Sequence, residues 1–255
     1  MKLIDISAAV VEPATITFVD VRQRFNFKRI AIGRWVTQPE QCKAASAFYN
    51  ALVDLMMALQ CPETVISLRG SLSFQYGIGG RPGVAAHYDP SQRCFALAKN
   101  AGPGSIAHEW FHAFDHYLAD KVFSDITQVS ATSMFASNAW LSDATPIPHS
   151  LNDKLYQCFK SIMLSADGKQ PSALFKVSSQ IDRKLNSNYY ARPEEMCARA
   201  FEAFIADSIP NNAFLVTGTL TSEEAKLGLY PQREQRQLIN HAFNDYFSLL
   251  GLALS

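Results

Sequence analysis

The order of apolar and polar residues divides the chain into a strand-rich beginning and a helix-rich remainder. Alternating runs at 15–19 and 29–32 predict two short strands. Apolar side chains then recur at helical spacing over 38–59, just ahead of Pro62, and predict a long helix. Glycines and prolines separate the next short apolar runs, which predict strands joined by hairpins. These runs are at 65–68, 72–76 and 94–98.

From Ser105 onward the pattern changes to helical periodicity. Ser105 is a suitable N-cap for an apolar-rich helix over 106–118. Further helices are expected near 152–164, 171–185, 193–206 and 232–250. The sequence therefore predicts an α+β fold in which a small, mostly antiparallel N-terminal sheet precedes a mainly helical half. Without a repeat or a linker, we expect one domain over 1–255, with the sheet part at about 1–121 and the helical part at about 122–255.

Composition narrows the class of protein without naming a function. Of the 255 residues, 48% are hydrophobic, and 23 basic side chains balance 23 acidic ones. This balance excludes disordered and coiled-coil classes, and a formal charge of zero argues against nucleic-acid or membrane-surface partners. The five cysteines form no CxxC pair, no run of 18 apolar residues occurs, and the start lacks the pattern of a secretory signal. We therefore expect a cytoplasmic protein.

One short motif carries recognisable chemistry. His108, Glu109 and His112 form an HExxH run inside the helix predicted over 106–118. Histidines four residues apart lie one turn from each other on the same helical face, so two imidazoles can reach one metal ion. Glu109 projects beside that face, where it can take a proton from water as a general base. HExxH on a helix is the arrangement of zinc metalloproteases.

The motif leaves the third metal ligand open. His116 continues the spacing, but at 1.5 Å per residue it lies roughly 12 Å along the axis from His108, too far to share an ion. Asp115 is better placed to accept the second ring proton of a ligand histidine and hold its tautomer. Three downstream acids are candidate ligands, and periodicity alone does not select among them. They are Glu194, Glu195 and Glu202.

Three separated segments resemble one family. The segment over 104–118 reads GSIAHEWFHAFDHYL, that over 86–90 reads AHYDP, and that over 189–204 reads YYARPEEMCARAFEAF. In this order they resemble the large polyvalent protein-associated domain 1 family, whose zincin-like domains occur on phage and mobile-element proteins. The likeness covers about 25–250 and implies a bacterial or phage origin.

A more distant likeness, to lethal-factor-type zinc peptidases, bears on the ligands. Those proteins combine an HExxHxxD helix with a second helix whose first Glu binds zinc, and Glu195 is the residue that matches it. By the same likeness Glu202 would support the site from behind the ligands. A tyrosine before the ligand Glu would donate to the oxyanion, for which Tyr189 and Tyr190 are the candidates. Phe111 departs from the pattern, because these families usually have Gly there.

The sequence thus predicts a zinc metallopeptidase in which His108, His112 and Glu195 hold Zn²⁺ and Glu109 is the base. Its substrate would be a peptide or protein, with the loop-rich segment 122–190 walling the cleft. One alternative is a catalytically inactive zincin-like module that binds a partner protein around a structural zinc. Another is a metal-free helical protein with a chance HExxH. His87 and His149 are better explained as ordinary polar residues, and 77–83 as a glycine-rich rim.

Overall fold

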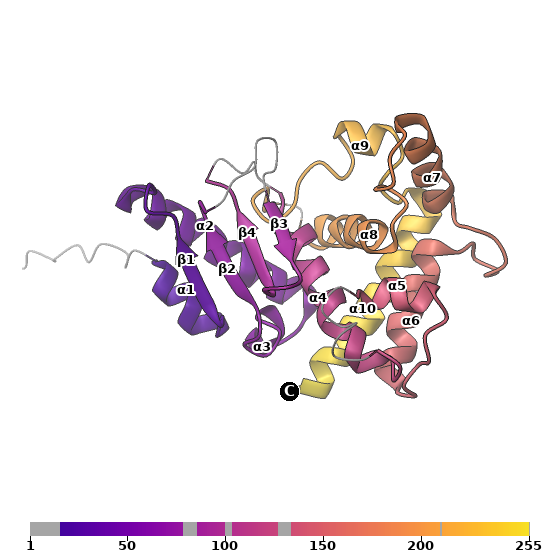
Figure 1. The fold of residues 1–255 in the computed structure, drawn as a ribbon, viewed down its shortest axis with the longest axis horizontal. Helices are drawn as coiled ribbons and strands as arrows, with labels where there is room; N and C mark the ends of the chain where they lie inside the picture. The colour runs from indigo at the N-terminus through magenta and orange to yellow at the C-terminus, as the bar shows by residue number, and fades with distance from the viewer. Residues whose placement is uncertain (1–15, 79–85, 100–103, 127–133, 210, 255) are drawn as a thin grey trace, which may run out of the picture.

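A four-stranded sheet with its covering helices and a cluster of further helices form the two sides of the computed structural model (Figure 1). The structure describes residues 16–78, 86–99, 104–126, 134–209 and 211–254. The elements in chain order are α1 (Phe18–Phe25), β1 (Arg29–Ile32), α2 (Gln38–Leu59), α3 (Glu63–Ile66), β2 (Ser73–Tyr76), β3 (Ala86–Asp89), β4 (Cys94–Leu97), α4 (Ile106–Val122), α5 (Ala136–Leu141), α6 (Ser150–Met163), α7 (Ala173–Leu185), α8 (Pro193–Ser208), α9 (Glu223–Lys226) and α10 (Arg233–Leu254).

The sheet is mixed, so the prediction of a mostly antiparallel sheet is wrong. Its strand order is β1-β2-β4-β3. The pairs β1–β2 and β2–β4 are parallel, and only β3 runs antiparallel to its neighbour β4. The physical reason lies in the connection, because α2 carries the chain back along the sheet and the next strand can then start from the same end. The sequence predicted this helix, but we expected hairpins between the strands.

Most predicted elements are confirmed, and two predicted strands are wrong. Instead of a strand at 15–19, α1 begins at Phe18, and Thr17 and Asp20 form its capping box, with Thr17 N donating to Asp20 Oδ2 over 2.7 Å. The run at 65–68 belongs to the short helix α3 and the turn after it. A run of four or five residues fits a strand or a helix equally well, and at α1 the capping box favours the helix. The strand β3 and the helices α5 and α9 were not predicted.

An aromatic core locks α4 between α8 and α10. Phe111 is buried, and its ring lies 4.8 Å from that of Phe201 on α8 and 5.8 Å from that of Phe243 on α10. At the preceding position of the helix, Trp110 donates through Nε1 to the carbonyl of Ile66 over 2.9 Å. Phe111 therefore packs in the core, and the helix that carries the HExxH run is held on several sides.

The loop after α8 returns to the start of α4. Gly104 N donates to the carbonyl of Phe214 over 3.2 Å, and Ala107 N to that of Leu215 over 3.1 Å. Gly104 has φ +102°, and a Cβ there would lie 2.5 Å from Cγ2 of Thr217. Only glycine fits this close approach without displacing the loop. The described part of the predicted rim ends at residue 78, and its remainder lies outside the described residues. No described helix is long and apolar enough to cross a bilayer.

Candidate metal centre

Two helices bring three potential metal ligands together. His108 and His112 lie one turn apart on α4, and Glu195 lies in the first turn of α8. The Nε2 atoms of the two histidines are 3.0 Å apart. Glu195 spans both rings, with Oε2 at 3.3 Å from Nε2 of His108 and Oε1 at 3.5 Å from Nε2 of His112. One donor atom from each side chain lies within 4.8 Å of the others.

These separations suit a tetrahedral ion. Ligand atoms bonded to zinc at about 2.0–2.1 Å and at tetrahedral angles lie about 3.3 Å from one another. The three measured separations, 3.0, 3.3 and 3.5 Å, bracket that value. Oε2 of Glu195 is also buried, and among the described residues it has the 3.3 Å contact with Nε2 of His108 but no well-formed hydrogen bond. A buried carboxylate oxygen left unpaired is costly, and a cation would compensate it, so the donor set fits a metal ion.

The side chains of the cluster shift one another's pKa values. Burial by itself lowers the pKa of His108, but the charge of Glu202 and hydrogen bonds to Glu195 and Glu202 raise it well above the ordinary histidine value. Burial raises the pKa of Glu195, yet its close contacts with the rings of His108 and His112 bring it well below its usual range. The ionised carboxylate is the state that a divalent ion requires, whereas His108 must lose its extra proton when a metal binds.

Glu202, rather than Asp115, accepts from a ligand histidine. Its Oε2 lies 3.0 Å from Nδ1 of His108, and the Tyr230 hydroxyl donates to the same oxygen over 3.1 Å. Asp115 instead accepts from N and Oγ of Ser137, over 2.8 and 2.6 Å, while Nδ1 of His112 has no hydrogen-bond partner among the described residues. The predicted hydrogen bond from a ligand histidine to Asp115 is therefore wrong, because α5 occupies its carboxylate. Sequence reasoning also missed Tyr230, for which no spacing gave a signal.

Glu109 is buried on α4, and its charge contributes to raising the pKa of both His108 and Tyr189. It therefore lies close to the cluster, as the predicted base should. This proximity is compatible with the predicted role of Glu109 as a general base.

The two candidate tyrosines face different partners. Partial burial and the charge of Glu195 raise the pKa of Tyr189, although 42% of the residue is exposed. Tyr190 directs its ring to Arg199, whose guanidinium carbon lies 5.7 Å from the ring centroid, and its carbonyl accepts from Nη2 of the same arginine. The charge of Glu195 thus acts on Tyr189, whereas Tyr190 contacts Arg199.

The remaining candidate residues have structural partners. Nδ1 of His116 lies 2.7 Å from the Tyr88 hydroxyl, outside the three-ligand cluster. Asn138 donates to Glu194 over 2.8 Å, which links α5 to α8. His149 caps α6 by accepting from Leu151 N, and His87 is exposed on the edge strand β3. None of these residues belongs to the cluster.

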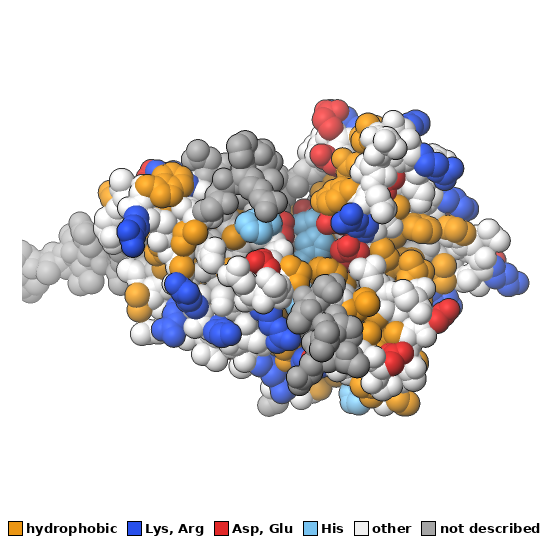
Figure 2. Space-filling model, viewed as in Figure 1, with side chains coloured by type: hydrophobic (Ala, Val, Ile, Leu, Met, Phe, Trp, Pro, Cys, Tyr) orange, Lys and Arg blue, Asp and Glu red, His pale blue; other side chains and the backbone are white. Residues whose placement is uncertain are grey.

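The cluster reaches the surface where the two sides of the molecule meet. In the space-filling view, histidine and acidic side chains gather between the sheet-bearing side and the helical side (Figure 2). The His108 side chain keeps 16% of its surface exposed, so a solvent route to the three ligands exists. From the segment predicted to wall the cleft, the ring of Phe135 lies 5.9 Å from that of His112.

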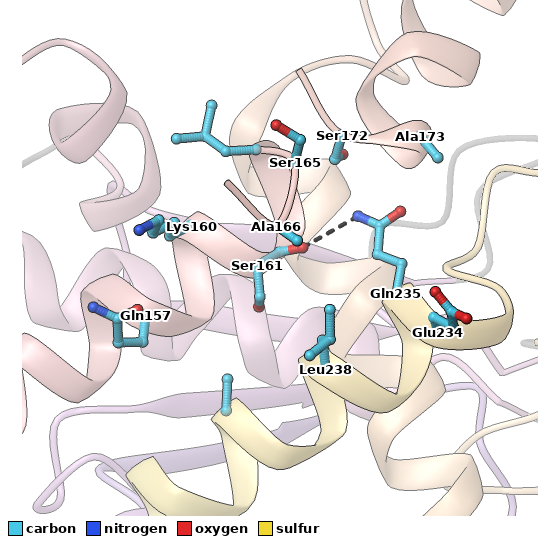
Figure 3. A pocket seen from close by; sticks show the side chains of 12 residues that line it. Gln157, Lys160, Ser161, Ser165, Ala166, Ser172, Ala173, Glu234, Gln235 and Leu238 are labelled. Atoms are coloured by element: carbon cyan, nitrogen blue, oxygen red, sulfur yellow. Dashed lines mark hydrogen bonds between the residues drawn. The ribbon is translucent and has the colours of Figure 1, made fainter. Parts of the chain in front are cut away.

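A separate pocket of about 430 Å³ lies between α6, α10 and the start of α7 (Figure 3). Its central polar side chain is Gln235, which donates from Nε2 to the carbonyls of Ser161 and Ile162, both over 3.2 Å. Oε1 of Gln235 accepts from Leu174 N over 3.2 Å. Because this amide is already satisfied within the fold, it ties three helices together, and the metal ligands lie elsewhere.

Comparison with known families bears on the C-terminal part of the chain. Residues 181–254 match the family model of large polyvalent protein-associated domain 1. The match supports the family resemblance inferred from the sequence, and the matched segment carries Glu195, Arg199, Glu202 and Tyr230. The HExxH helix α4 lies outside it. None of the curated proteins and none of the solved structures matches the chain.

Proposed function

We propose that this protein is a zincin-like, zinc-dependent peptidase that hydrolyses peptide bonds. The observation that carries the proposal is the arrangement of His108, His112 and Glu195, whose ligand atoms lie at the separations of a tetrahedral site and whose α4 also presents a glutamate directly after the first histidine. Three protein ligands leave a fourth position for water or substrate, which is the pattern of catalytic rather than structural zinc sites.

The residues of the chain have separate tasks in this reaction. When bound, zinc supplies a Lewis acid that acidifies water and polarises a carbonyl group. Glu109 takes a proton from the attacking water as its oxygen bonds to the carbonyl carbon. The C–N bond then breaks, Glu109 passes the proton to the departing nitrogen, and a carboxylate and an amine are released. Tyr189 donates a hydrogen bond to the carbonyl oxygen as negative charge develops there.

Glu202 and Tyr230 act on the ligands and not on the substrate. The hydrogen bond between Glu202 and Nδ1 of His108 leaves the lone pair of Nε2 directed at the cluster. Tyr230 fixes Glu202 from the other side. This pair therefore orients His108 for metal binding.

Substituting Glu109 tests catalysis separately from metal binding. Wild type and Glu109→Gln are each reconstituted with zinc, and metal content is measured by elemental mass spectrometry. Both are then incubated with a peptide library made from a denatured proteome, and new termini are identified by mass spectrometry. We expect one zinc per chain in both proteins and new termini only with the wild type. Glu194→Gln, next to the ligand but bonded to Asn138, is the matched control and should behave as the wild type.

Two results would contradict the proposal. If both proteins hold zinc and neither produces new termini, the site is structural and a protein-binding module is the better description. If the wild type retains well under one zinc per chain after reconstitution, the HExxH run serves no metal.

A further inference from the structure

Arg199 lies on α8 between the two glutamates of the metal centre, one turn after Glu195 and one turn before Glu202. It is 4% exposed. Its guanidinium makes two hydrogen bonds to backbone carbonyls of segments far apart in the sequence. Nη2 donates to the carbonyl of Tyr190, and Nε donates to the carbonyl of Leu229 over 2.9 Å. Burying the charge of Arg199 costs free energy, and these hydrogen bonds of its guanidinium go to main-chain carbonyls.

Each of these carbonyls adjoins a tyrosine of the site. Tyr190 directly follows Tyr189, whose pKa is raised by burial and by the charge of Glu195. Leu229 precedes Tyr230, whose hydroxyl donates to Glu202 over 3.1 Å. Arg199 therefore holds both the segment that carries Tyr189 and the segment that carries Tyr230.

The first of these segments has a second support. The Asp182 carboxylate, at the end of α7, accepts from the backbone N–H groups of Tyr189 and Tyr190, both over 3.0 Å, and of Ala191 over 2.8 Å. These bonds fix the turn that leads into α8, at a place where a free loop would lose much conformational entropy on ordering. Asp182 therefore supports the segment of Tyr189 but not that of Tyr230, whereas Arg199 supports both segments.

We propose that Arg199 is a positioning residue that holds the segment of Tyr189 at the start of α8 and sets Tyr230 against Glu202, and through them tunes the affinity of the site for zinc. The inference rests on the proposed function for its metal. Arginine suits the task because its planar fork offers several donors in fixed directions, so that one side chain can hold two carbonyls. Lysine would keep the charge but place a single ammonium, which cannot reproduce both contacts.

Fluorine NMR of the metal-free protein tests the positioning itself. The chain is labelled with 3-fluorotyrosine, and the resonances of Tyr189 and Tyr230 are assigned with their Phe variants. Arg199→Lys should shift or broaden both resonances, and Asp182→Asn only that of Tyr189. The matched control is Arg236→Lys, which should change neither resonance. Arg236 is a buried arginine of α10 and is bonded to Asp207 on α8, the helix that also carries Arg199. Both resonances unchanged in Arg199→Lys would overturn the proposal. Arg199→Gln, with one amide donor and no charge, replaces Arg199→Lys if the latter does not fold.

Zinc affinity, measured by competition with a chromophoric chelator, tests the consequence. Arg199→Lys should weaken zinc binding about 10-fold, the scale seen when partners of metal ligands are removed. If it acts through Tyr230, the double variant Arg199→Lys/Tyr230→Phe should bind zinc as weakly as the weaker single variant. Fully additive losses, or an equal loss in Arg236→Lys, would show a general packing role and overturn the proposal. A wild type that binds no zinc would defeat the proposed function, while the fluorine measurement would still decide the role of Arg199.

Discussion

Oε2 of Glu202 lies 3.0 Å from Nδ1 of His108, at the opposite end of the imidazole from the three-ligand cluster. The contact joins α8 to α4 across 94 positions of sequence. A carboxylate in this position fixes both the ring orientation and the tautomer of the histidine, and it raises the basicity of the ring nitrogen that faces the metal.

Removing the charge of Glu202 should weaken metal binding. Glu202→Gln is expected to lower zinc affinity by about 10–100-fold, because an amide holds the ring less firmly and offers a donor as well as an acceptor. Chelator competition measures the change. Glu194→Gln on the same helix is the control, since Glu194 bonds Asn138 and not a ligand. Equal affinities of Glu202→Gln and wild type would refute this role.

The two adjacent tyrosines should differ in their effect on catalysis. If Tyr189 donates to the developing oxyanion, Tyr189→Phe should lower kcat by roughly 100-fold, the scale for losing one such donor, with little change in KM. Tyr190→Phe should leave kcat close to wild type, because the Tyr190 ring lies on Arg199 and its carbonyl, which the substitution retains, makes the hydrogen bond. Steady-state kinetics on a peptide identified in the library screen make the comparison. Similar losses in both variants would contradict the assignment.

Asp115 should make the stability of the metal-free protein depend on pH. Burial raises the pKa of this carboxyl to about 6, even though hydrogen bonds from Ser137 lower it. Because the folded pKa lies above the unfolded value of about 3.9, the folded state binds more protons, and stability falls as the pH rises between about 4 and 6. The contribution is at most about 1.4 kcal/mol per pH unit.

Asp115→Asn should remove this contribution. The amide can still accept from Ser137 N, so the variant is expected to fold and to show a smaller decrease in stability between pH 4 and 6 than the wild type. Urea denaturation at several pH values measures the free energy of unfolding. An unchanged pH dependence would mean that Asp115 titrates near its ordinary value.

Gly251 should tolerate no side chain. A Cβ at this position of α10 would lie 2.2 Å from the carbonyl oxygen of Gln60 at the end of α2. Gly251→Ala gains helix propensity, but it must push two helices apart, and we expect a net destabilisation of about 1–3 kcal/mol. Leu252→Ala, at a side chain 77% exposed, is the control and should change stability by less than about 0.5 kcal/mol. Denaturant unfolding of both variants decides the point.

The sequence by itself determined the features whose cause is local. The helix over 38–59 follows from apolar periodicity and a capping box between Thr37 and Glu40, and the structure places α2 at these residues. The spacing of His108 and His112 fixes their relative position wherever the helix lies, because one turn of helix separates them. Glu109 is tied to the same turn by covalent connection alone.

Tertiary structure decided everything that depends on which distant segments meet. Periodicity left Glu194, Glu195 and Glu202 as alternatives, among which only a family likeness favoured Glu195. The packing of α8 on α4 turns Glu195 to both histidines and Glu202 to the back of His108. Asp115 had suitable spacing, but α5 places Ser137 against it. The sheet order was likewise out of reach, since a strand's residues specify its length and faces and not its partner. Neighbouring residues determine local hydrogen bonds and turn geometry, whereas the packing of the whole chain determines which distant segments are in contact.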